Sequence, residues 1–184
     1  SYTDSGTAVA VQHDVYVVGD TDGVFPGATR GGGIDAYVRR STPDGSVVWV
    51  RQIGTSATDR AVAVAAGPSV VYVGGWTHGA LPGLSNAGSG DVFVRAYDVG
   101  GNALWTREFG SSAFDSPTGI AIDATGVYVS GNTNGALPGQ VLVGGQDGFI
   151  RKYDSAGNEL WTRQFGTTGF DSARAVSTVP GRVY

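Results

Sequence analysis

Short stretches of alternating apolar and polar residues recur along the chain and predict β-strands. Within residues 59–114, four runs have this character: residues 61–66, 70–75, 91–97 and 103–109. The third run alternates as a half-buried strand should, with Val92 and Val94 on one face and Phe93 and Tyr97 on the other. No segment has the period of a helix. The hydrophobic pattern therefore predicts an all-β protein.

The whole pattern returns every 56 residues. Tyrosines in the second run mark this register: Tyr16, Tyr72, Tyr128 and Tyr184. Tryptophans in the fourth run repeat with the same spacing: Trp49, Trp105 and Trp161. The repeats divide the single domain, residues 1–184, into units at about residues 4–58, 59–114, 115–170 and a partial unit, 171–184. A faithful period of this length indicates a solenoid or a propeller.

The turns within a unit favour the propeller. A tight turn joins the first two runs, and Asp, Gly and Asn join the last two, as in residues 98–102 and 154–158. Each unit then forms two hairpins, that is, four antiparallel strands, which is the composition of a propeller blade. A parallel β-helix is the alternative, but its coils are usually shorter, roughly 20 to 30 residues, and carry no such hairpins. We predict three complete four-stranded blades and part of a fourth.

The composition agrees with this fold and excludes some classes of binding partner. The chain has 31 glycines and 7 prolines in 184 residues, which is typical of a turn-rich β protein. A net charge of −4 and a single lysine, Lys152, argue against a nucleic-acid surface. The absence of cysteine excludes disulfides and thiol chemistry. No apolar run is long enough to predict a membrane span.

The repeated residues resemble a known family. Each unit carries Gly-x-Thr-x-Gly-x-Leu/Phe-Pro-Gly, then Asp-x-Tyr/Phe-Val/Ile-Arg, and the later units carry Tyr-Asp-x-x-Gly-Asn-x-Leu-Trp-Thr-Arg-x-Phe-Gly. This string resembles the SBBP-type β-propeller repeat of bacteria and archaea. The first unit departs from it, with residues 41–46 in place of Tyr-Asp-x-x-Gly-Asn. The resemblance implies a propeller, often seven-bladed, in an exported or cell-surface protein, and supplies no active site.

A second resemblance concerns the tryptophans. Asp98-x-x-Gly-Asn-x-x-Trp105 and its copy ending at Trp161 look like the tryptophan-docking motif of quinoprotein dehydrogenase propellers. In those enzymes the motif locks one blade to the next. The resemblance implies that Trp49, Trp105 and Trp161 pack between blades and do not contact a ligand.

Comparing the units separates structural residues from candidate functional ones. Aspartates recur at the start of the first and third strands: Asp4, Asp59, Asp115 and Asp171, and Asp35, Asp91 and Asp147. We interpret them as acceptors for backbone N–H groups and not as metal ligands. After the second strand the units differ, and a connection of roughly fifteen residues follows, a length typical of functional loops. Strand order places these loops on one propeller face, which is the predicted binding surface.

Four residues of these variable segments are the candidate ligand-binding residues: Trp76, His78, Asn132 and Asn134. Trp76 beside His78 could form an aromatic platform for a sugar ring. Asp20 and Asp22, followed by a glycine, resemble the start of a calcium loop, because hard cations bind clustered oxygens. We expect no cofactor, and treat these two aspartates as a candidate calcium site.

No constellation for catalysis stands out. No serine, histidine and aspartate share a known catalytic spacing, and His13 and His78 belong to different parts of their units. The leading hypothesis is a non-catalytic, exported or cell-surface scaffold or adhesion module that binds protein or polysaccharide through the long loops. The alternatives are a carbohydrate-active hydrolase or lyase whose catalytic residues lie partly outside this segment, and, less favoured, a quinoprotein dehydrogenase.

The number of units bears on assembly. Three units and two further strands leave an open arc with an exposed blade face, whereas a ring typically needs at least about four whole blades. The chain also contains no methionine. We expect it to be a segment of a longer propeller, with self-association into a ring as the alternative.

Overall fold

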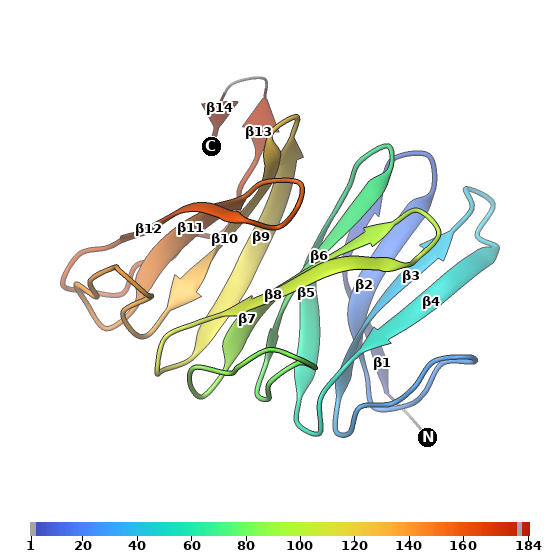
Figure 1. The fold of residues 1–184 in the computed structure, drawn as a ribbon, viewed down its shortest axis with the longest axis horizontal. Coiled ribbons are helices and arrows are strands. Elements are labelled where there is room, and N and C mark those ends of the chain that lie inside the picture. The colour runs from blue at the N-terminus through green and yellow to red at the C-terminus, as the bar shows by residue number, and fades with distance from the viewer. Residues whose placement is uncertain (1–2, 180–181) are drawn as a thin grey trace.

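The computed structural model describes residues 3–179 and 182–184, and all of its regular structure is β (Figure 1). Three antiparallel four-stranded sheets follow one another along the chain. Blade 1 contains β1 (Asp4–Val11), β2 (Val15–Thr21), β3 (Asp35–Ser41) and β4 (Val47–Ile53). Blade 2 contains β5 (Asp59–Ala66), β6 (Val70–Thr77), β7 (Asp91–Asp98) and β8 (Ala103–Phe109). Blade 3 contains β9 (Asp115–Asp123), β10 (Gly126–Thr133), β11 (Asp147–Tyr153) and β12 (Glu159–Phe165).

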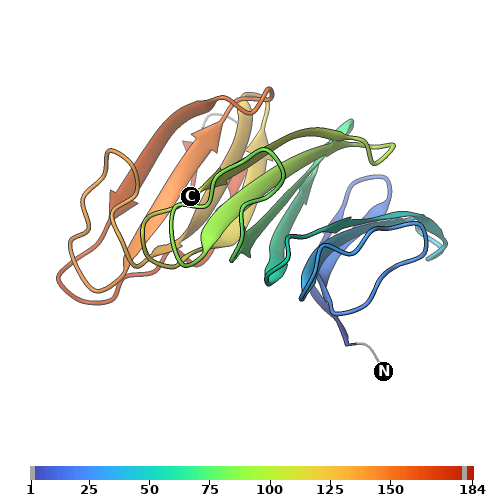
Figure 2. The same ribbon diagram turned by 60° about the horizontal axis from the view of Figure 1, so that its bottom comes forward.

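The arrangement confirms the predicted propeller-like fold. Within every blade the strands lie in chain order, so each pairs only with its neighbours in the sequence. The sheets stand face to face in a row, and the arc they form is not closed (Figures 1 and 2). The blades are also alike in detail, because a register shift interrupts the first strand pair and the last strand pair of each.

The hydrophobic core lies between the blades. One cluster joins Val18 and Trp49 of blade 1 to Val71 and Phe93 of blade 2. A second cluster joins the other side of blade 2 to blade 3, and Val92 and Val94 belong to it. The predicted alternation of β7 is therefore confirmed: its two faces contribute to two different cores. Each blade buries its apolar side chains only against its neighbours.

The beginning of the fourth unit differs from the prediction of two full strands. Only a two-residue ladder forms there, between β13 (Thr178–Val179) and β14 (Arg182–Val183), while residues 171–177 lie outside any sheet. In blade 2, by contrast, Asp59 at the start of the first strand pairs with Thr77 at the end of the second.

The divergent turn of blade 1 keeps the geometry of the others. Thr42 N–H donates to Ser46 O at 2.9 Å, as Asp98 N–H donates to Asn102 O at 3.0 Å in blade 2. Gly45 has φ of +90° and Gly101 has +81°, a conformation that glycine adopts without the Cβ clash of other residues. The glycine, which the units share, thus preserves the turn although its neighbours differ.

Candidate functional site

The long loops between second and third strands share one edge of the blades with the connections between blades. These loops span residues 22–34, 78–90 and 134–146, and the connections span residues 54–58, 110–114 and 166–170. Short parallel bridges tie loop to connection at Gly90 and Phe114 and at Gln146 and Phe170. We call these six segments the loop face. Its location agrees with the surface expected from the strand order.

Each loop is held by the same contacts. A Pro-Gly turn carries a glycine with positive φ, +77° at Gly27, +78° at Gly83 and +71° at Gly139. A side chain of the blade's fourth strand then accepts the N–H of the residue before the proline, as Gln164 Oε1 accepts from Leu137 N at 3.0 Å. Leu137 itself is buried. The base of the loop is therefore fixed by the blade.

The recurring aspartates are structural, as the repeats indicated. Asp59 accepts the N–H of Thr55 at 2.7 Å, and Asp115 accepts that of Ser111 at 2.6 Å. Burial raises the pKa of both carboxyls, and hydrogen bonds from nearby threonine or serine groups counteract it. The aspartates of the third strands also accept backbone N–H groups: Asp147 accepts the Val143 N–H at 3.0 Å. All of these contacts close the turns that precede strands.

The structure brings Trp76 and His78 together at the loop face and adds a third ring. Their centroids lie 4.9 Å apart, and Phe114 lies 5.4 Å from Trp76 and 5.8 Å from His78. The Arg60 guanidinium lies 5.9 Å from the Trp76 ring centroid. Trp76 is thus half-buried, with His78, Phe114 and Arg60 around its ring. His78 is exposed, and its Nδ1 contacts the Ser89 carbonyl.

Asn132 and Asn134 lie in the next blade and do not join this cluster. Asn132 Oδ1 accepts the Ala173 N–H at 3.1 Å, which connects blade 3 to the fourth unit. Asn134 Oδ1 accepts from Gln146 Nε2 at 3.0 Å across the base of its loop. Asn134 is exposed and Asn132 is half-buried. The four predicted ligand residues therefore form two separate groups, and each has a structural contact.

Asp20 and Asp22, the candidate calcium residues, point to different partners. Asp20 Oδ1 accepts Ser5 Oγ at 3.0 Å and lies 3.8 Å from Arg60 Nη1 of blade 2. Asp22 Oδ1 accepts the Thr3 N–H at 2.6 Å. Within residues 3–179 and 182–184, no three His, Asp or Glu side chains gather in a way that could hold a metal ion. Calcium at this position stays a prediction, and these contacts would compete with it.

Sequence reasoning missed Phe114, Arg60 and Glu108. Phe114 completes the aromatic cluster, and Arg60 bridges Asp20 to Trp76. Glu108 occupies a position where the other units have glutamine, Gln52 and Gln164. Arg60 and Glu108 vary between units, so the comparison that selected Trp76 could have selected them too, whereas Phe114 recurs as Phe170 and is replaced only in the first unit, by Thr58.

Glu108 alters the hydrogen bonding beneath its loop. In the other blades the glutamine Nε2 donates to the third-strand aspartate, at 3.0 Å from Gln52 to Asp35 and from Gln164 to Asp147. A glutamate cannot donate unless it is protonated. Burial raises the pKa of Glu108, and the charge of Asp91 raises it further, while the Leu81 N–H lowers it. Blade 2 thus has two neighbouring carboxyl groups, Glu108 and Asp91, where the other blades have a glutamine amide beside an aspartate.

The two histidines lie at opposite edges of the blades. His13 lies in the turn between β1 and β2, at the edge opposite the loop face, so it is remote from His78. No helix that could cross a membrane occurs in the part of the chain that the structure describes. What the loop face presents is a fixed frame with different side chains on each blade, an arrangement suited to recognition.

Comparison with known proteins adds one partial similarity. No protein-family model matches the chain. It is similar to the regulatory protein FlaEY of Caulobacter vibrioides, with 33% identity over 109 residues. The match covers 55% of this chain and only 11% of the relative, so the chain spans about a tenth of that protein's length.

Proposed function

We propose that this chain is a non-catalytic scaffold or adhesion module, exported or displayed at the cell surface, that binds protein or polysaccharide through the loop face. The repeated motifs support placing it with the SBBP-type propeller repeats, and that resemblance supports the location. The regulatory role in the name of the FlaEY relative belongs to a much longer protein and is not transferred here.

The observation that carries the proposal is the contrast between constant loop bases and variable loop tips. The bases repeat one set of hydrogen bonds, from Phe25, Leu81 and Leu137 to the fourth strand. The tips after the Pro-Gly turns differ in chemistry: Ala28-Thr29-Arg30, Leu84-Ser85-Asn86 and Gln140-Val141-Leu142. A rigid frame with different exposed side chains gives recognition at low entropic cost, because the loops are already ordered.

Of the two ligand classes, protein is better supported than polysaccharide. A sugar-binding platform needs an aromatic face open to solvent. Trp76 instead packs edge-on against His78 and Phe114, with Arg60 on the ring. Exposed apolar side chains are present on the third loop, where Val141 is 75% exposed and Val143 is 51% exposed. Such residues favour contacts with another protein surface.

A binding assay tests the proposal: the chain is immobilised and exposed to cell-surface protein extracts and to a panel of polysaccharides. Val141→Asp places a charge on the loop face, and Val47→Asp is the matched control, because Val47 is 55% exposed on the outer strand β4. We expect Val141→Asp to weaken binding at least tenfold, consistent with burying an unpaired charge, while Val47→Asp binds as the unaltered chain does. Loss through Val47→Asp alone would contradict the loop face. Release of sugar products would contradict a non-catalytic role and favour the enzyme alternative.

A further inference from the structure

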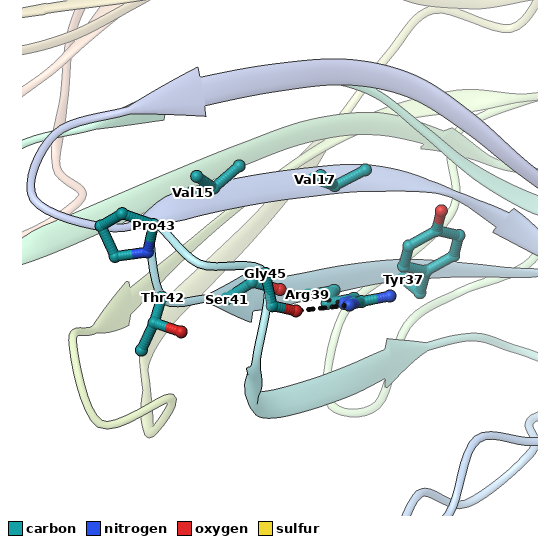
Figure 3. Close-up of a pocket in the computed structure, with 8 residues that line it drawn as sticks. All are labelled: Val15, Val17, Tyr37, Arg39, Ser41, Thr42, Pro43 and Gly45. Atoms are coloured by element: carbon teal, nitrogen blue, oxygen red, sulfur yellow. Dashed lines mark hydrogen bonds between the residues drawn. The ribbon is translucent and has the colours of Figure 1, made fainter.

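The third strand of each blade carries an arginine at the same position: Arg39, Arg95 and Arg151. In blade 1, Arg39 Nε donates to Ser41 Oγ at 3.0 Å, and Nη2 donates to Gly45 O at 3.3 Å (Figure 3). In blade 3, Arg151 Nε donates to Thr162 Oγ1 at 2.7 Å. In blade 2, Arg95 Nε is buried and has no hydrogen-bond partner among the described residues. A buried donor without a partner destabilises a fold, so Arg95 lacks a group that its counterparts have.

In blade 3 this arginine is paired with a carboxylate. Arg151 Nη1 lies 3.4 Å from Glu159 Oε2, and Thr162 Oγ1 donates to Glu159 Oε1 at 2.7 Å. The threonine hydroxyl thus accepts from the guanidinium and donates to the carboxylate. Because Arg151 is only 4% exposed, the pairing compensates for the burial of its charge.

Blade 2 keeps the arginine and the threonine of this arrangement but not the carboxylate. The threonine is present as Thr106, which lies opposite Arg95 in the ladder between β7 and β8. Ala103, however, stands where blade 3 has Glu159. None of the ion pairs among the described residues includes Arg95. Its guanidinium therefore has no counterion in the described part of the chain.

A pocket of about 340 Å³ lies beside Arg95, between blades 1 and 2. It is lined by Arg51 and Gln52 of β4, by Arg95 and Tyr97 of β7, and by residues 101–103, and no carboxylate is among these lining residues. Both blades have all four strands, and the pocket lies outside the loop face. Its volume is within the range of ligand-binding pockets, roughly 300–1,000 Å³.

Arg51 adds a second positive charge to the pocket. It follows Trp49, whose Nε1 donates to Val99 O of blade 2 at 3.0 Å, so the tryptophan packs between blades as expected. Arg51 Nε donates to Gly101 O at 2.8 Å, and Nη1 donates to Val50 O at 2.9 Å. Among the described residues, its Nη2 group is therefore the one left for a ligand.

Two equivalent tyrosines reflect the missing carboxylate. Burial raises the pKa of Tyr97, and the charges of Arg95 and Arg51 act to lower it. Burial also raises the pKa of Tyr153, and there the negative charge of Glu159 is among the causes that raise it. Tyr97 thus lies near two arginine charges, whereas Tyr153 lies near a carboxylate as well. Two like charges beside one pocket favour the binding of an anion.

We propose that the pocket between blades 1 and 2 binds a carboxylate, which takes the place that Glu159 occupies in blade 3. One carboxylate oxygen would accept from Thr106 and the other from Arg95, and Arg51 Nη2 would add a second charge. A planar guanidinium suits this ligand, because its N–H groups match the two oxygens of a carboxylate. The glutamate of blade 3 sets the size of the ligand: a carboxylate on a short aliphatic stem, as in propionate.

NMR titration of the isotopically labelled chain with propionate tests this proposal. At constant ionic strength we expect a saturable shift of the Arg95 Nε–H signal and none of the Arg151 Nε–H signal, whose partners are already present. Propionamide, a neutral molecule of the same shape, should produce no saturable shift. A blocked Gly-Glu-Gly peptide distinguishes the source of the carboxylate. Tighter binding than propionate would assign it to a partner protein, and equal or weaker binding would assign it to a free organic acid.

Two exposed positions provide matched variants. Ala103→Glu supplies the carboxylate from within the chain, so it should shift the Arg95 signal without propionate and abolish propionate binding. Val47→Glu places the same charge at the equivalent position of blade 1, and we expect it to change the affinity less than about twofold, because distant surface charges are screened. Arg95→Gln should weaken binding roughly tenfold or more, through loss of a charge-assisted hydrogen bond. The backbone spectrum of each variant shows whether the fold is kept.

Three results would overturn the proposal. The first is the absence of a saturable Arg95 shift throughout the millimolar range of propionate. The second is an equal shift with propionamide, which would mean that the charge of the ligand is not recognised. The third is unchanged propionate affinity in a folded Ala103→Glu variant, which would place the bound propionate elsewhere.

Discussion

Glu108 carries a charge where its repeat partners, Gln52 and Gln164, carry a neutral amide. Its carboxyl accepts the Leu81 N–H at 2.9 Å, as glutamine does elsewhere, but it has no amide to offer Asp91. Burial also raises the pKa of Asp91, and the nearby Asp115 charge adds to this. By contrast, the pKa of Asp147 is lowered. Burial acts to raise it, but hydrogen bonds outweigh that effect, and the largest of them comes from the Gln164 amide. Blade 2 therefore carries an unfavourable pair of carboxylates at neutral pH.

Replacing this residue with glutamine should stabilise the protein. We expect Glu108→Gln to increase the free energy of unfolding by about 1 kcal/mol at pH 7, because an amide donor replaces a second negative charge. In the folded chain the pKa of Glu108 is raised above its ordinary value of 4.5. Its ionisation therefore destabilises the folded state, and this effect is complete at pH values above the raised pKa. Below about pH 4.5 both proteins carry a neutral group there, and the difference should vanish. Urea unfolding at pH 7 and below about pH 4.5 measures this difference in the free energy of unfolding.

The reverse change provides the control. Gln52→Glu introduces the same carboxyl pair into blade 1, beside Asp35, and should destabilise the chain at pH 7 by a similar amount. If Glu108→Gln instead destabilises at pH 7, the glutamate has a favourable partner there, and the interpretation is wrong.

At the level of elements, the turns between third and fourth strands both reverse the chain and receive the neighbouring tryptophan. Alanine substitution at Gly101 of such a turn is compared with the same change at Gly83, which lies in the Pro-Gly turn of a long loop. Gly83 has φ of +78° and open space around its Cβ position, whereas Gly101 has φ of +81° and the Trp49 ring within 2.9 Å. Gly83→Ala should cost only the backbone strain, about 1–2 kcal/mol. Gly101→Ala should cost roughly 1–3 kcal/mol more, because the ring must move.

Urea unfolding and tryptophan emission together measure this difference. Gly101→Ala should alter the emission of the folded state, and Gly83→Ala should leave it unchanged. Equal losses of stability in the two variants would mean that the contact between blades contributes nothing at this turn.

For the whole molecule, stability should be greatest in the middle. Blade 2 buries both of its faces, one in each core cluster. On blade 3, Phe165 is 49% exposed, although the equivalent Phe109 of blade 2 is only 7% exposed. Hydrogen exchange should therefore be slowest in β6 and β7 and faster in β12, since local opening follows the number of buried contacts. Uniform protection across the three blades would instead indicate that the chain opens as one cooperative unit.

The sequence by itself determined the blade. The 56-residue period, the alternation of Val92 and Val94 with Phe93 and Tyr97, and the glycines of the turns all act locally, so pattern and turn chemistry were sufficient to predict them. The strand-start aspartates were correctly predicted to accept backbone N–H groups for the same reason, because the N–H donors lie four residues away. The strand order within each sheet also followed, since hairpins pair neighbours.

Only the tertiary structure decided which residues of different segments meet. Phe114 joins Trp76 from the connection after β8, and Asp20 reaches Arg60 in the next blade. Trp49 of blade 1 likewise lies against Gly101 of blade 2. Such contacts depend on how the sheets stack, and stacking is set by side chains distant in sequence. A repeat pattern predicts each blade, whereas what a surface binds depends on contacts that only the stacked blades create.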